Sequence, residues 1–100
     1  MTTYFISRHP GALEWAKQHH IHYDVHYPHL SRLDFLMEGD VVIGSLPINL
    51  VYILNLQGVR YQHLSLVIPQ ELRGVELSAQ QLQQCQAKLE EFQVTKVNNN

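Results

Sequence analysis

Residues 2–11 read TTYFISRHPG, and this stretch predicts the opening unit of an α/β fold. Residues 4–6 are a short apolar run that suits a buried strand. Pro10 suits the first turn of a helix, because the N–H that proline lacks would be unpaired there in any case. With Gly11 it turns the chain, and we expect a helix over residues 11–20. A strand that leads directly into a helix is typical of α/β proteins.

Three polar side chains, Ser7, Arg8 and His9, occupy the junction between this strand and this helix. Ligands of open α/β sheets bind at the carboxyl ends of the strands. A helix N-terminus also favours anions, because its backbone N–H groups are unpaired and its dipole is positive there. A hydroxyl, a guanidinium and an imidazole at such a junction indicate a site for phosphate.

The rest of the chain alternates predicted strands and helices. Residues 21–27 and 59–67 alternate apolar and polar positions, whereas residues 41–44 are continuously apolar, as in a strand covered on both faces. The sequence predicts two further helices, over residues 48–57 and 78–92, and a short final strand over residues 94–97. Residues 29–39 form a connector. The last of these helices carries a single apolar stripe of Leu82, Cys85, Leu89 and Phe92. The connector is expected to form a turn of helix that caps the core.

This order predicts an α/β fold with a mostly parallel sheet of four or five strands and helices on both faces. Residues 1–97 form a single domain in this interpretation, and residues 98–100 form a disordered tail.

The helix predicted over residues 48–57 is apolar nearly all round. A surface helix carries a polar face, so we expect the sheet to cover one side and a second subunit to cover the other. Pro47 stands where this helix should begin, and Ser45 is a candidate for its N-cap. Gly58 suits the residue that follows a helix end.

Neighbouring parallel strands end at one crevice, so polar residues near three strand ends are expected to meet there. The ligand-binding candidates are Ser7, Gly44, Ser45, Asn49, His63, Ser65 and Arg73, and the catalytic candidates are Arg8 and His9. Arginine forks match phosphate oxygens, and the set lacks the carboxylate cluster that Mg²⁺ would need. The set therefore predicts a small phosphate or phosphodiester ligand, without a metal or another cofactor.

Each candidate also has a plain structural interpretation. Arg8 could serve as an ion-pair partner, and His9 could cap the turn. Asn49 could bond to the backbone, and Arg73 could be an ordinary loop residue. His63 and Ser65 could be polar core residues whose hydrogen bonds are satisfied.

The composition argues against several classes of binding partner. Seven Lys and Arg against nine Asp and Glu give a net charge of −2, which argues against the basic face that long nucleic acid requires. The single cysteine, Cys85, excludes an internal disulfide and fits the reducing cytosol, so we expect a cytoplasmic protein. No signal sequence or membrane-length apolar run is evident, and we expect no membrane partner.

Five of the seven histidines lie between His19 and His29 and suggest a metal patch. On the predicted strand, however, His22 and His26 would be separated by roughly 13 Å. Because no cysteine or carboxylate pattern supports the cluster, a metal site is not the favoured interpretation.

Four sequence blocks, SRHPGA (7–12), GSLP (44–47), RYQHLSL (60–66) and PQELRGVEL (69–77), occur in order along the chain. They resemble the VVA1548 type of small CRISPR-associated proteins, a Csx-group family of type III systems. The resemblance implies a Rossmann-like fold related to the CARF domain. It also implies a ring nuclease that degrades cyclic oligoadenylate, with cyclic tetra-adenylate as the expected ring, and so switches off type III antiviral signalling.

In the implied reaction a ribose 2′-OH attacks its own 3′-phosphodiester and gives a 2′,3′-cyclic phosphate. Neither a metal nor a protein nucleophile is needed, and the protein stabilises the charge on phosphorus. Arg8 is expected to stabilise that charge and His9 to move a proton. Ser7, Ser45 and Asn49 are expected to position phosphates and riboses. A two-fold symmetric ring suits a homodimer.

Three other functions stay open at this point. A sensor or sponge would bind cyclic oligoadenylate without cutting it. A histidine-phosphatase-like enzyme is suggested by Arg8 and His9 after the first strand, but Pro10 replaces the glycine of an RHG motif and the chain is short for that fold. A non-catalytic interaction protein is the third.

Overall fold

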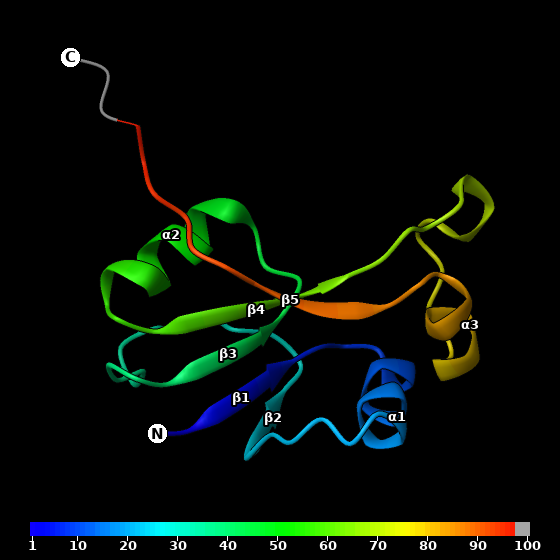
Figure 1. Cartoon of the computed structure of the whole chain (residues 1–100), viewed down its shortest axis with the longest axis horizontal. Helices are drawn as coiled ribbons and strands as arrows, with labels where there is room; N and C mark the ends of the chain where they lie inside the picture. Colours follow the sequence, from blue (N-terminus) through cyan, green and yellow to red (C-terminus); the bar gives the residue numbers. More distant parts are fainter. Residues whose placement is uncertain (98–100) are drawn as a thin grey trace.

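The sheet consists of four parallel strands and one antiparallel strand at its edge (Figure 1). The computed structural model describes residues 1–97. The strands are β1 (Thr3–Ile6), β2 (Val25–Tyr27), β3 (Val41–Gly44), β4 (Arg60–Ser65) and β5 (Lys88–Phe92). Their order across the sheet is β2-β1-β3-β4-β5. The predicted Rossmann-like architecture is thus confirmed, and the predicted tail at 98–100 lies outside the described residues.

The helices begin and end where local sequence favours it. They are α1 (Pro10–Gln18), α2 (Ile48–Leu56), the short 3₁₀ helix η1 (Gln70–Leu72) and α3 (Ala79–Gln84). Pro10 occupies the first turn of α1 as predicted, and Gly58 adopts φ +78° just after α2. Ser78 caps α3 in a reciprocal pair with Gln81, in which each side chain accepts from the other residue's backbone N–H.

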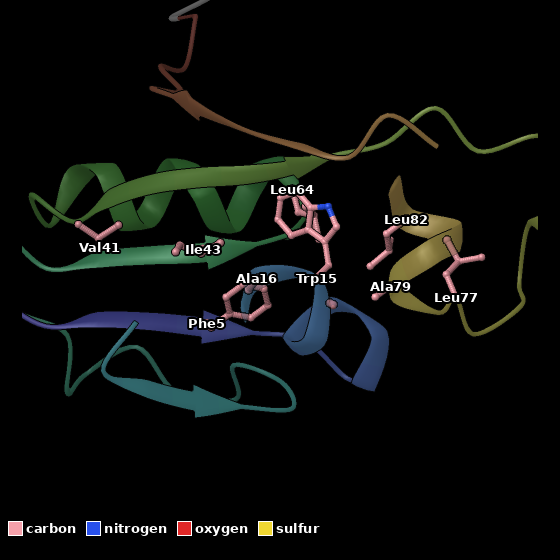
Figure 2. Close-up of a cluster of buried hydrophobic side chains, with 10 residues drawn as sticks. Phe5, Trp15, Ala16, Val41, Ile43, Leu64, Leu77, Ala79 and Leu82 are labelled. Atoms are coloured by element: carbon pink, nitrogen blue, oxygen red, sulfur yellow. The ribbon is translucent and has the colours of Figure 1, made fainter. Parts of the chain in front are cut away.

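Alternate residues of β3 supply the two cores. Val41 and Ile43 pack with α1 and α3 on one face, whereas Val42 packs with α2 on the other. Figure 2 shows the first core, in which Trp15 of α1 lies beside Leu82 of α3. Helices therefore cover both faces, and β3 is buried along its whole length, as its continuous apolarity predicts.

Gly11 lies inside α1 and lets that helix approach the backbone of a distant segment. A Cβ at this position would be 2.0 Å from the carbonyl oxygen of Leu77 and 2.8 Å from the Cα of Ser78. The prediction that Gly11 serves the turn into the helix misses this role. The residue lacks a side chain because the chain leading into α3 passes directly over it.

The helix predicted over residues 78–92 is wrong in its second half. The α-helix α3 ends at Gln84, Gln86 adopts φ +59°, and the chain returns as β5, antiparallel to β4. A continuous helix would leave the outer edge of β4 without hydrogen-bond partners. The pairing of β5 satisfies that edge and places Arg60 and Glu91 in a two-bond ion pair. Tertiary pairing therefore overrides the apolar stripe.

Other boundaries also differ from the prediction. Strand β2 begins at Val25 rather than at residue 21, because Ile21 and Tyr23 pack on the core without joining the ladder. Residues 94–97 form no strand, and the backbone N–H of Val94 instead donates to the Asn55 side chain on α2. The connector over residues 29–39 forms turns rather than a helical turn.

No helix within the described part of the chain is long and apolar enough to cross a membrane.

Candidate functional site

A cavity of about 810 Å³ lies at the carboxyl edge of the sheet, beyond β1 and β3. The chain leaves β1 for β2 on one side and leaves β3 for β4 on the other, so the order of connection reverses between these two strands (Figure 1). Such switch points are where open α/β sheets bind ligands. We call this space the switch-point cavity. Its polar and charged lining residues are Ser7, Arg8, His9, His29, Ser45 and Glu76.

Hydrogen bonds fix the loop that follows β1. The backbone N–H of Ser7 donates to Tyr27 O over 3.1 Å, and the Ser7 hydroxyl oxygen accepts from the backbone N–H of His9 over 3.1 Å. His26 Nε2 lies 2.8 Å from Ser7 O. Ser7 therefore shapes the turn, and Arg8 lies between two anchored residues.

The side chains of Arg8 and His9 are free of structural partners within residues 1–97. Arg8 forms no ion pair there, and His9 occupies the N-cap position of α1 without a side-chain capping bond. The first turn of α1 also carries no acidic residue. Arginine, imidazole and the positive end of the α1 dipole thus lie together, which is an arrangement that attracts an anion.

The floor of the cavity comes from the residues after β3. Tyr61 donates its hydroxyl hydrogen to Gly44 O over 3.0 Å, and the backbone N–H of Leu46 donates to that hydroxyl over 2.9 Å. His63 Nδ1 lies 2.6 Å from the same oxygen. Because the single hydroxyl hydrogen is directed to Gly44, we infer that Nδ1 carries the hydrogen of the His63 contact. Tyr61, which lies on the face of the sheet that α2 covers, thus holds the residues that follow β3 in place.

Gly44 and Ser45 both line the cavity but take different local roles. A Cβ on Gly44 would lie 3.0 Å from Ile6 O, so glycine lets β3 end close to β1. The Ser45 hydroxyl donates to Leu64 O over 3.3 Å and does not cap α2, whose N-cap position belongs to Pro47. The N-cap interpretation of Ser45 is therefore wrong.

Four predicted ligand residues lie outside the switch-point cavity. Asn49 is exposed on α2, and Arg73 is exposed between two lining residues without lining the cavity itself. His63 lines a second cavity of about 530 Å³ beside α2 and β5, and Ser65 shares its face of β4 by alternation. The sequence places these residues near strand ends correctly but does not determine the direction of their side chains.

Sequence reasoning missed His29 and Glu76. His29 follows Pro28, which ends the second predicted strand, so the strand-end rule that selected Arg8 also applies to it. The histidine-cluster interpretation assigns His29 to a metal patch instead. Glu76 lies in the loop before α3 and is the only carboxylate among the described lining residues. No local signal sets it apart from other loop carboxylates.

The histidine cluster separates in the fold. His19 contacts Gln83 over 2.7 Å, His22 pairs with Asp24 over 3.1 Å, and His26 contacts the Ser7 backbone. Within residues 1–97 no three His, Cys, Asp or Glu side chains are grouped so that they could hold a metal ion.

Removing the Tyr61 hydroxyl is expected to loosen the cavity floor. Tyr61→Phe leaves the buried Gly44 carbonyl and the Leu46 N–H without their partner, and each lost bond of this kind costs about 1–3 kcal/mol. We expect a corresponding fall in the free energy of unfolding, measured by urea titration at pH 7. Tyr52→Phe on α2 serves as the control and should change that free energy by less than about 0.5 kcal/mol.

Wild type and Tyr61→Phe should also differ in how their free energy of unfolding depends on pH. Burial raises the pKa of Tyr61, partly opposed by the bond from the Leu46 backbone. The stabilisation that this raised pKa provides is complete below about pH 10, where tyrosine in an unfolded chain begins to ionise, and is lost as the pH rises through the folded-state pKa. The stability advantage of wild type over Tyr61→Phe should therefore shrink above pH 10. An advantage that stays constant to pH 11 would contradict this role.

Comparison with known families identifies the relationship. The family model described as "Putative CRISPR-associated protein (Cas_VVA1548)" matches residues 4–95. The chain belongs to this family. The match to the Cas_VVA1548 family includes every residue that lines the switch-point cavity, and it confirms the resemblance carried by the four sequence blocks. No curated protein and no solved structure matches the chain significantly.

Proposed function

We propose that this Cas_VVA1548-family protein is a metal-independent ring nuclease that opens cyclic oligoadenylate, with cyclic tetra-adenylate as its expected substrate. One observation carries the proposal: Arg8, His9 and the N-terminus of α1 converge on the cavity at the sheet's switch point. The family's association with CRISPR supports a ligand drawn from CRISPR signalling. Opening the ring would end that signal in a type III system.

The residues of the cavity fit a phosphodiester. Arg8 presents a guanidinium that has no ion-pair partner within residues 1–97, and its fork matches two phosphate oxygens. Ser7 and Ser45 line the same cavity; the Ser45 hydroxyl donates to Leu64 O, whereas the Ser7 hydroxyl accepts from the His9 N–H and can donate its hydrogen to a phosphate oxygen. The volume of about 810 Å³ falls within the range of small-molecule sites.

The proposed reaction needs positioning and charge stabilisation rather than a protein nucleophile. The 2′-oxygen of one ribose forms a bond to the adjacent phosphorus, and the bond from phosphorus to the 5′-oxygen breaks. The products are a 2′,3′-cyclic phosphate and a free 5′-hydroxyl. Arg8 stabilises the negative charge that grows on the non-bridging oxygens, and His9 transfers a proton. The Ser7 hydroxyl and the positive end of the α1 dipole hold the phosphate in line.

The decisive assay follows the fate of the ring. Purified protein is incubated with cyclic tetra-adenylate in EDTA, and the products are separated by chromatography and identified by mass. Linear products that end in 2′,3′-cyclic phosphate are expected. An intact ring after long incubation, together with tight binding, would contradict cleavage and favour the sensor or sponge. Cleavage that EDTA abolishes would contradict the metal-independent mechanism.

A homodimer is the proposed assembly, and α2 is its proposed interface. Val51 and Leu54 of α2 are buried against the sheet, whereas Ile48 and Leu56 are 72% and 68% exposed. A second copy on this face would cover those side chains and bring two cavities to one two-fold symmetric ring.

Charges on the exposed face of α2 are expected to separate the subunits. The double variant Ile48→Asp and Leu56→Asp places carboxylates at the proposed contact, where burial without a partner is costly. Analytical ultracentrifugation should show a monomer and ring cleavage should fall at least tenfold. Val67→Asp, which changes a 67% exposed apolar residue whose backbone bonds to Cys85 after α3, should keep the dimer. A double variant that remains dimeric would contradict this interface.

A further inference from the structure

His29 stands beside Arg8 at the end of the neighbouring strand. Ile6 of β1 pairs with Tyr27 of β2 in parallel register, and the Ser7 N–H extends the ladder to Tyr27 O over 3.1 Å. Arg8 and His29 each follow this pair by two residues, and both line the switch-point cavity. The imidazole of His29 thus belongs to the same site as the SRHP segment, although it lies about twenty positions further along the chain.

Two further contacts hold the end of β2 against the end of β1. His26 Nε2 lies 2.8 Å from Ser7 O, and the Tyr27 ring stacks on Tyr4 with centroids 6.2 Å apart. The loops that carry Arg8 and His29 therefore start from one fixed platform. This matters because proton transfer requires the donor and acceptor to be positioned to within hydrogen-bond reach.

The proposed ring opening requires two proton transfers. The attacking 2′-hydroxyl must lose a proton, and the departing 5′-oxygen must gain one. The titratable or charged side chains that line the cavity are Arg8, His9, His29 and Glu76. Arginine stays protonated and is unsuited to proton exchange, whereas imidazoles take up and release protons near neutral pH. The cavity thus holds two imidazoles for two transfers.

We propose that His29 is a second catalytic residue that works with His9 as an acid–base pair. This inference rests on the proposed ring nuclease function. One imidazole, neutral at the start, accepts the 2′-hydroxyl proton as the bond from the 2′-oxygen to phosphorus forms. The other, an imidazolium at the start, donates its proton to the 5′-oxygen as the bond from phosphorus to that oxygen breaks. The ring is opened. The 2′-oxygen has lost a proton and the 5′-oxygen has gained one, so the two histidines have exchanged protonation states.

Substitution of His29 tests the pair through the rate and its pH dependence. His29→Gln is expected to lower kcat for cyclic tetra-adenylate at least 100-fold with KM changed less than threefold, as the loss of a proton-transfer group predicts. The bell-shaped pH–rate profile of wild type should lose one limb. Glu76→Gln should keep both limbs. His22→Gln is the matched control, because His22 is exposed and pairs with Asp24 outside the cavity.

A substrate with sulfur in place of the 5′-bridging oxygens identifies the acid. A thiolate leaves without protonation, so the variant that lacks the acid should recover most of its rate with this substrate, and the variant that lacks the base should not. His9→Gln and His29→Gln are compared in the same assay. Recovery of only one variant supports the pair, and recovery of both or of neither overturns it.

Failure of this inference is distinct from failure of the proposed function. A wild-type protein that leaves the ring intact contradicts both. A wild-type protein that opens the ring, beside a His29→Gln variant that keeps its rate and both limbs of the pH profile, contradicts the role of His29 alone. Thermal unfolding of each variant, which should match wild type within a few degrees because His29 is exposed, separates loss of chemistry from loss of fold.

Discussion

Replacing Arg8 with alanine is expected to lower kcat for ring opening at least about 100-fold, because a guanidinium directed at the charge on phosphorus acts mainly in the transition state. The side chain is exposed and forms no ion pair within the described residues, so its removal should leave the free energy of unfolding within about 0.5 kcal/mol of wild type. Single-turnover chromatography of cyclic tetra-adenylate and urea titration measure the two quantities.

Two arginine variants make this result specific. Arg8→Lys keeps the charge but loses the two-pronged fork, and it should recover only part of the rate. Arg73→Ala removes another exposed arginine that lies beyond the switch-point cavity, and it should retain activity near that of wild type. An Arg8→Ala protein that opens the ring at the wild-type rate would contradict the assignment, and so would a deeper loss in Arg73→Ala.

Gly11→Ala is expected to lower the free energy of unfolding more than Gly39→Ala does. The new Cβ would lie 2.0 Å from the Leu77 carbonyl oxygen and 2.8 Å from the Ser78 Cα, which are backbone atoms that cannot rotate away. Alanine favours a helix over glycine by about 1 kcal/mol, but forced overlap in a packed site costs typically 1–3 kcal/mol and at times more. We expect a net loss of about 2 kcal/mol or more, because α1 must move away from α3.

The measurement uses the single tryptophan. Trp15 lies buried between α1 and α3, so its fluorescence follows the separation of these helices during urea unfolding (Figure 2). Gly39→Ala is the control: it has φ +91° and no atom within 4 Å of the added Cβ, so it reports backbone strain alone, about 1–2 kcal/mol. A Gly11→Ala protein at least as stable as wild type would show that helix propensity outweighs the overlap.

The parts of the fold that could be predicted are those set by neighbours in sequence. Pro10 begins α1, Gly58 follows α2, and Ser78 caps α3, each through a bond or a backbone angle that involves residues close by. Residues 88–92 do not by themselves predict strand β5, because its formation depends on the unpaired edge of β4. A strand and a helix of this length can carry the same apolar spacing.

The residues of the candidate site also differ in whether their placement depends on neighbours in sequence or on packing. Ser7, Arg8 and His9 are consecutive, so finding the strand end placed all three at the cavity. For Asn49 and Arg73 the sequence predicts the neighbourhood but not the direction of the side chain, which depends on how α2 and the loop after β4 pack. His29 also follows a strand end, but it is the parallel register of β2 against β1 that brings this end to the same cavity as Arg8.

The contact of Gly11 with Leu77 and Ser78 also affects when the site forms during synthesis. The segment with Arg8 and His9 is made early, but the backbone against which its helix packs is made some sixty-five residues later. Contacts so far apart in sequence form late, since a long loop must close first. A chain emerging from the ribosome therefore exposes the SRHP segment well before the backbone of Leu77 and Ser78 is available to pack against α1. Nascent or truncated chains that stop short of Ser78 should lack a formed cavity and, with it, the proposed activity.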